Sequence, residues 1–160
     1  MLKITVVCVG KIRENFLTEG IREYEKRLSA YCRLQWAEVP DERIPDAASE
    51  REEEAVQSAE GERIRKKIPG NAYVIALAID GKMRDSVGFS EHLDGLASAG
   101  RSHLVFLIGG SLGLSREILA LADEKMSFSR MTFPHQLMRL IFLEQLYRAF
   151  RISHNEPYHK

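Results

Sequence analysis

Apolar residues follow two different periods along this chain, and segments of the two kinds alternate. Three stretches are apolar at most positions, which is typical of strands covered on both faces of a parallel sheet. They are Leu2–Val9, Ala72–Ile79 and Leu104–Ile108. Two further short strands are predicted at Leu34–Val39 and Met126–Phe133.

Between these stretches the apolar residues recur every three or four positions, as they do on one face of a helix. In the first helix, Asn15–Tyr31, the stripe consists of Leu17, Ile21, Tyr24, Leu28 and Tyr31. A second helix is predicted from Ser49, which fits a capping box with Glu52, to about Ile68. The other three are predicted from about Ser90 to Ala99, after a Ser115 cap, and from Pro134 to about Ile152.

The order of these elements predicts the fold class. Strands and helices alternate with short loops, so residues 1–160 are expected to form a single α/β domain, Rossmann-like, with a mostly parallel sheet and helices on both faces. Asp80–Lys82 is predicted to be the turn that ends the third strand. Ligands of such sheets bind beyond the carboxyl ends of the strands, which here include the positions after Ile79, Ile108 and Phe133.

Composition excludes several classes of protein. Hydrophobic residues make up 44% of the chain and charged residues 29%, as in an ordinary soluble domain. No apolar run reaches the roughly 18 residues of a membrane span, and the chain opens on a predicted strand where a signal peptide would carry a charged leader. Cys8 and Cys32 have neither metal-ligand nor disulfide-framework spacing, so we expect two reduced thiols, no metal and a cytoplasmic location.

Charge is balanced over the whole chain but not along it. Residues 41–60 contain eight acidic and two basic residues, whereas residues 130–160 contain five basic and two acidic residues and three histidines. The acidic segment is most simply a solvated surface. A polyanionic partner would therefore be expected to meet the C-terminal third.

Two segments of that third are candidates for chemistry. Gly109–Gly113 follows a buried strand, but it matches neither a dinucleotide fingerprint nor a P-loop, so a plain tight turn explains it as well as a ligand site. The tail Glu156–Lys160 is either a frayed end or a group of side chains that reaches a phosphate or an acceptor base. His135 is expected to orient the start of the last helix.

The last predicted helix is apolar around most of its circumference. A helix with two apolar faces is either buried in its own domain or shared with a second subunit, and the size of this chain favours a homodimer. The apolar positions are Leu137, Met138, Leu140, Ile141, Phe142, Leu143, Leu146, Tyr147, Ala149, Phe150 and Ile152.

Four segments together resemble the RlmH family, small SPOUT-class methyltransferases of large-subunit ribosomal RNA. They are Leu107–Gly113, Met131–Arg139, Glu144–Ala149 and Asn155–Lys160, and the opening residues Ile4–Lys11 and the segment Glu23–Leu28 are similar as well. The combination of a Gly-Gly loop, a Pro-His helix start and this tail is specific, and the resemblance covers the whole chain.

The resemblance implies a C-terminal trefoil knot at about residues 104–152, followed by a tail at 153–160. It also implies a homodimer that uses S-adenosylmethionine to methylate N3 of a pseudouridine in 23S ribosomal RNA on the assembled ribosome. The implied cofactor-binding residues are Leu77, Gly109, Phe128, Ser129, Arg130, Met131, Thr132 and Phe133, with Gly110 close by. The candidates for the catalytic role, expected to face the other subunit's pocket, are His159, Tyr158 and Arg148.

Two other functions remain open at this point. One is a related knotted methyltransferase that acts on transfer RNA, although the chain is small and has no added RNA-binding domain. The other is a nucleotide-binding regulatory module of Rossmann-like shape, which the absence of a dinucleotide fingerprint disfavours.

Overall fold

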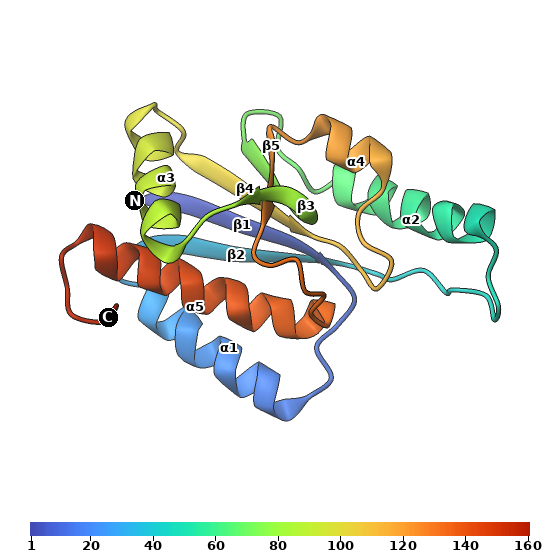
Figure 1. Cartoon of the computed structure of the whole chain (residues 1–160), viewed down its shortest axis with the longest axis horizontal. Helices are drawn as coiled ribbons and strands as arrows, with labels where there is room; N and C mark the ends of the chain where they lie inside the picture. The colour runs from blue at the N-terminus through green and yellow to red at the C-terminus, as the bar shows by residue number, and fades with distance from the viewer.

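All five strands run parallel in one sheet with the order β2-β1-β4-β3-β5, in a computed structural model that describes residues 1–160 (Figure 1). The strands are β1 (Leu2–Val9), β2 (Cys32–Val39), β3 (Tyr73–Met83), β4 (His103–Ile108) and β5 (Glu124–Ser127). The helices are α1 (Asn15–Leu28), α2 (Glu50–Arg65), α3 (Ser86–Ser98), α4 (Arg116–Leu121) and α5 (His135–Ser153). The predicted α/β class with a parallel sheet is confirmed.

Helices cover both faces of this sheet, as predicted. Helices α1, α3 and α5 pack on one face, where Phe106 of β4 contacts Phe89 and Phe142. Helices α2 and α4 lie over the other face (Figure 1). Val105 and Leu107 pack in the apolar core on that side. Successive residues of β4 thus alternate between two apolar cores, which explains why this strand is apolar at every position after His103.

Two predicted strand boundaries are wrong, at β3 and β5. Strand β3 continues through the expected turn at Asp80–Lys82, because Leu77 and Lys82 both pair with Met126 across an irregularity in the strand. A Cβ atom on Gly81 would lie 2.6 Å from the Met126 backbone, so only glycine permits this approach. Strand β5 ends at Ser127, and residues 128–133, expected in the strand, form a loop.

Side-chain caps explain where three of the helices begin. At α4 the predicted cap, the Ser115 hydroxyl, accepts a hydrogen bond from the Ile118 amide at 3.3 Å. Ser49 and Glu52 form the predicted capping box at the start of α2. Helix α3 begins at Ser86, four residues before the predicted start, because the Asp85 carboxylate accepts a hydrogen bond from the Gly88 amide at 2.7 Å. Pro134 is the residue just before α5 and not part of its first turn.

The first half of α5 is joined to the sheet by a buried arginine. The Arg139 side chain is only 2% exposed. Its guanidinium donates to the carbonyl oxygens of Val9 at 2.9 Å and Gly10 at 2.7 Å, and it forms an ion pair of 2.6 Å with Glu38. Arg139 therefore fixes α5 against the carboxyl ends of β1 and β2.

No helix combines the length and the apolar character that crossing a membrane requires. No three His, Cys, Asp or Glu side chains are grouped in a way that could hold a metal ion.

Both cysteines are expected to be unreactive in the folded protein. Burial raises the pKa of Cys8 to about 11 and that of Cys32 to about 12, and neither forms a disulfide. Because the thiolate is the reactive form, a disulfide reagent at pH 8 should modify neither thiol in buffer and both in guanidinium chloride. Rapid modification of the native protein would contradict this prediction.

Candidate functional site

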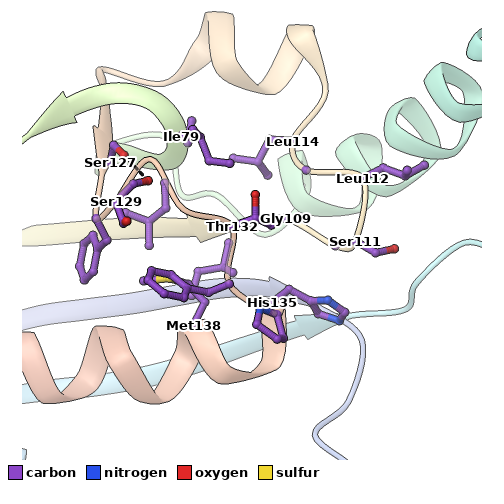
Figure 2. Close-up of a pocket in the computed structure, with 18 of the residues that line it drawn as sticks. Ile79, Gly109, Ser111, Leu112, Leu114, Ser127, Ser129, Thr132, His135 and Met138 are labelled. Atoms are coloured by element: carbon purple, nitrogen blue, oxygen red, sulfur yellow. Dashed lines mark hydrogen bonds between the residues drawn. The ribbon is translucent and has the colours of Figure 1, made fainter.

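A cavity of about 740 Å³ opens beside the carboxyl ends of β4 and β5 (Figure 2). The segment after β4, the loop after β5 and the irregular part of β3 form its walls, and the start of α5 closes it. This is the edge of a parallel sheet at which ligands bind, and the volume lies within the range of cofactor sites.

Most of the predicted cofactor-binding residues line this cavity. They come from three segments that are far apart in the sequence but meet at one edge of the sheet. The lining includes Leu77, Gly109, Gly110, Phe128, Ser129, Met131, Thr132 and Phe133. Arg130 is the exception, since it is exposed and does not line the cavity.

The glycine loop is a tight turn that also forms a wall of the cavity. The Gly113 amide donates to the Gly110 carbonyl oxygen at 3.0 Å, and Gly113 has a φ of 81°, in the left-handed region that favours glycine. A Cβ atom on Gly109 would lie 2.7 Å from the carbonyl carbon of Gly113 and 2.9 Å from the Leu114 amide nitrogen. The two interpretations of this loop, turn and ligand site, are therefore compatible.

Replacing Gly109 by alanine is expected to weaken cofactor binding at least about tenfold, because the new methyl group forces the loop backbone to move. Isothermal titration with S-adenosylhomocysteine measures this change. Gly95→Ala on α3 is the matched control, since a Cβ atom there meets nothing within 4 Å. Unchanged affinity of the Gly109→Ala protein would mean that the loop does not hold the cofactor.

Hydroxyl groups fold the loop after β5. The Ser127 hydroxyl donates to the Ser129 carbonyl oxygen at 3.0 Å, and the Ser129 hydroxyl accepts from the Met131 amide at 2.9 Å. These local bonds replace strand pairing and turn the chain into the cavity wall (Figure 2). Met131 is left 75% exposed at the rim.

The chemistry of the walls fits S-adenosylmethionine. Apolar side chains such as Leu77, Phe133 and Met138 provide surfaces for an adenine ring and a thioether chain. The two loops also bring backbone amide and carbonyl groups to the same cavity, where such groups can hydrogen-bond the edge of the ring.

Several lining residues were not predicted. His135, expected only to orient the helix, lines the cavity, and burial followed by the nearby Arg139 charge lowers its pKa, so its imidazole is neutral at pH 7. Ser111 and Leu112 lie within Gly109–Gly113 and Ser127 lies within the predicted strand Met126–Phe133, although none of the three was named as a ligand residue. Ile79, Leu114 and Pro134 lie at the ends of such segments or next to them. Leu119 and Met138 were not expected to line a ligand site, because their helical spacing is that of core residues.

The three candidate catalytic residues gather near the chain end. Arg148 contacts Nδ1 of His159 at 3.1 Å, and its guanidinium lies over the Tyr158 ring, 4.7 Å from the centroid. Both Arg148 and the Tyr158 hydroxyl donate to Oε2 of Glu144 at 2.8 Å. The pKa of Tyr158 is raised, mainly by burial and then by hydrogen bonds with Tyr24 and Glu144. Its phenol therefore keeps its proton at pH 7.

Within one chain this group does not reach the cavity. Met138 lines the cavity, and Arg148 is ten positions further along α5, a separation of about 15 Å along the helix axis. The tail instead turns toward the end of α1, where Tyr31, in the turn after that helix, donates to Glu156 at 2.8 Å. The structure thus brings the cofactor candidates together and the catalytic candidates together, at two different places.

Comparison with known proteins gives one consistent result. The family described as predicted SPOUT methyltransferases matches residues 2–159. Proteins named ribosomal RNA large subunit methyltransferase H from Listeria monocytogenes and Exiguobacterium sibiricum are 55% and 54% identical over 159 residues, which is 99% of this chain and 100% of each relative.

A solved structure supports the fold independently. A probable methylase family protein from Haemophilus influenzae superposes with a TM-score of 0.57 at 15% identity, over 98% of this chain and 70% of that one. The sequence match, the parallel sheet and the cavity at its carboxyl edge agree with one another. The chain belongs to the SPOUT methyltransferase family.

Proposed function

We propose that this chain is an S-adenosylmethionine-dependent methyltransferase that modifies N3 of a pseudouridine in large-subunit ribosomal RNA, on the assembled ribosome and in the cytoplasm. The observation that carries this proposal is the cavity formed by Gly109–Gly113 and the loop after β5, in a chain that is 55% identical along its length to proteins named for that RNA. The trefoil knot expected at about residues 104–152 remains part of the proposal.

The residues of the cavity would hold the cofactor by shape and by backbone hydrogen bonds. Leu77, Gly109 and the segment from Phe128 to Phe133 would contact it, with Arg130 at the outer side of the loop. When bound, S-adenosylmethionine supplies a methyl group on a positively charged sulfur. The main contribution of the protein is then to hold the acceptor nitrogen in line with that group, since correct placement removes much of the entropic barrier.

The tail residues would act on the RNA. Arginine only donates hydrogen bonds, so Nδ1 of His159 accepts in its contact with Arg148, and the proton of a neutral ring is on Nε2. In this arrangement Nε2 of His159 is the donor available to a phosphate or a base. Arg148 keeps its charge and favours the deprotonated imide, the form of the acceptor that attacks.

A homodimer would bring the tail to a cavity. Helix α5 buries Phe142 and Leu143 in its own chain, whereas Leu137 and Ile141 stay partly exposed on another face. An apolar face of this kind suits a second copy of the helix. Pairing of two chains would also explain why the two groups of candidate residues lie apart within one chain.

The proposal is tested by incubating the protein with labelled S-adenosylmethionine and either assembled ribosomes, separated subunits or naked RNA from a strain that lacks the enzyme. We expect label on one pseudouridine and only in assembled ribosomes, because the basic charge of the C-terminal third is modest and shape must supply recognition. Equal labelling of naked RNA would contradict recognition of the particle.

Two other outcomes would lead to different functions. Label on transfer RNA alone would make the chain a knotted methyltransferase for that substrate. Thermal stabilisation by NAD, with none by S-adenosylmethionine or its demethylated product, would favour a regulatory nucleotide-binding module.

A further inference from the structure

One face of α2 lies directly behind the glycine loop. The Gln57 side-chain amide donates to the Leu112 carbonyl oxygen at 2.6 Å. One turn further along, Gly61 lies so close to Ser115 that a Cβ atom on Gly61 would be 2.6 Å from the Ser115 hydroxyl oxygen. Positions three and four apart on a helix share a face, so α2 contacts the loop and the residues after it through one continuous strip.

Glu60 lies in the middle of this strip. Its side chain is 5% exposed, although it carries a carboxylate. A Cβ atom on Gly110 would lie 3.0 Å and 3.3 Å from the two carboxylate oxygens, so the carboxylate packs against the Cα atom of Gly110. The same carboxylate accepts a hydrogen bond from the Glu42 amide at 2.9 Å, which fixes its position.

The burial of this group needs an explanation. A buried carboxylate loses its hydration, and here burial raises the pKa of Glu60. Glu60 does not line the cavity, so it does not touch a ligand bound there. What it does touch is the loop after β2, through the Glu42 amide, and the cavity-forming loop after β4, through Gly110.

We propose that Glu60 is a positioning residue: it holds Gly109–Gly113 in the conformation that binds the cofactor, and Gln57 holds the far end of the same loop. This inference rests on the proposed function for the identity of the ligand. A loop that is ordered before binding loses less conformational freedom when the ligand arrives, so its affinity is higher.

Three variants of α2 test this role. Glu60→Ala removes the contact with Gly110 and is expected to raise the Kd for S-adenosylhomocysteine about tenfold. Glu60→Gln keeps the size of the side chain and an oxygen that accepts from the Glu42 amide, so its Kd should stay close to that of the parent protein. Glu62→Ala, an exposed carboxylate of the same helix, is the control and should leave the Kd unchanged.

Amide hydrogen exchange provides a second readout that needs no ligand. In Glu60→Ala the amides of Gly110–Gly113 should exchange faster, while those of β4 keep their protection. A general loss of stability would instead speed exchange in the core strands as well. Gln57→Ala, which empties no buried space comparable to Glu60, should give the same local effect even if Glu60→Ala folds poorly.

A double-mutant cycle tests the contact itself. Gly110→Ala places a methyl group against the Glu60 carboxylate and should weaken binding. In the Glu60→Ala background the two contacts with the carboxylate are gone and only Val9 Cγ1, 3.3 Å away, still crowds that methyl group. The loss from the second substitution should therefore be smaller than in the parent protein. Additive losses would show that the two residues do not act together.

The outcomes of these experiments are distinct from those of the proposed function. Unchanged affinity and unchanged loop exchange in both Glu60→Ala and Gln57→Ala would overturn the inference. If the parent protein bound neither S-adenosylmethionine nor its product, the proposed function would fail, whereas the exchange of Gly110–Gly113 would still decide whether Glu60 orders the loop.

Discussion

Removing Pro157–Lys160 should lower the rate of methyl transfer at least about a hundredfold while leaving cofactor affinity nearly unchanged. The deletion removes Tyr158 and His159, the two tail residues that contact Arg148. None of the deleted residues lines the cavity, so the residues that would hold the cofactor remain in place. Activity is measured on ribosomes, and affinity by titration with S-adenosylhomocysteine.

The deletion also removes packing, and this effect has to be separated from the loss of chemistry. The Tyr158 ring stacks edge-on against Tyr147 with centroids 4.9 Å apart, and its hydroxyl bonds to Glu144. Loss of these contacts is expected to lower stability by about 1–2 kcal/mol. His159→Ala is the milder control, since His159 is exposed and its loss should reduce activity without a change in unfolding midpoint.

Mixed dimers would decide whether the tail serves the partner's cavity. A tail-deleted chain and a Gly109→Ala chain should each be poorly active alone. When they are combined, the intact tail of the Gly109→Ala subunit can meet the intact cavity of the tail-deleted subunit, so activity should reappear. No recovery in verified mixed dimers would place the tail's action within its own chain or outside the reaction.

Replacing Arg139 by methionine should destabilise the protein by about 3 kcal/mol. The substitution leaves the buried carbonyl oxygen of Val9 and the half-buried one of Gly10 without this donor, and each orphaned acceptor costs about 1–2 kcal/mol. The Glu38 carboxylate is 43% exposed and can turn to solvent, so its lost ion pair adds little. Urea unfolding at pH 7 measures the difference.

Glu38→Gln is the matched control for this prediction. It removes the charge partner but keeps Arg139 and its two bonds to the backbone, so the expected loss is below about 1 kcal/mol. If Glu38→Gln lost as much stability as Arg139→Met, the ion pair would contribute more than the hydrogen bonds from Arg139 to the backbone carbonyl groups.

The central strands were predictable because positions covered on both faces of the sheet accept little other than apolar residues. Strands β1 and β4 are covered on both faces, and a continuous apolar run is the direct consequence. The end of β5 was not predictable in the same way. Met131 and Phe133 are apolar for a different reason, since they line a cavity, and Phe128 both lines it and packs against Phe89 and Phe142 of the core. The Ser127 and Ser129 hydroxyl bonds that fold the loop leave no periodic signal.

Part of the candidate site was predictable from the sequence and part was not. The glycine turn and the Pro-His helix start were found because each combines an unusual composition with a strand end. The contribution of α2 was not found. Gln57 and Glu60 lie in a long polar helix, and its buried and exposed polar residues look alike in the sequence. Their role depends on which side of the helix faces β4, and only the packing of α2 on the sheet determines that.

The position of β1 in the sheet has a consequence for synthesis of the protein. Ile4 pairs with Leu34 on one edge and with Leu104 on the other, so one neighbour is near in sequence and the other is far. A chain emerging from the ribosome can complete the first pairing early, but the second edge of β1 stays open until His103–Ile108 has been made. Open apolar edges recruit other chains. Substitutions that weaken β4 should therefore reduce the yield of soluble protein more than their effect on the finished fold would suggest.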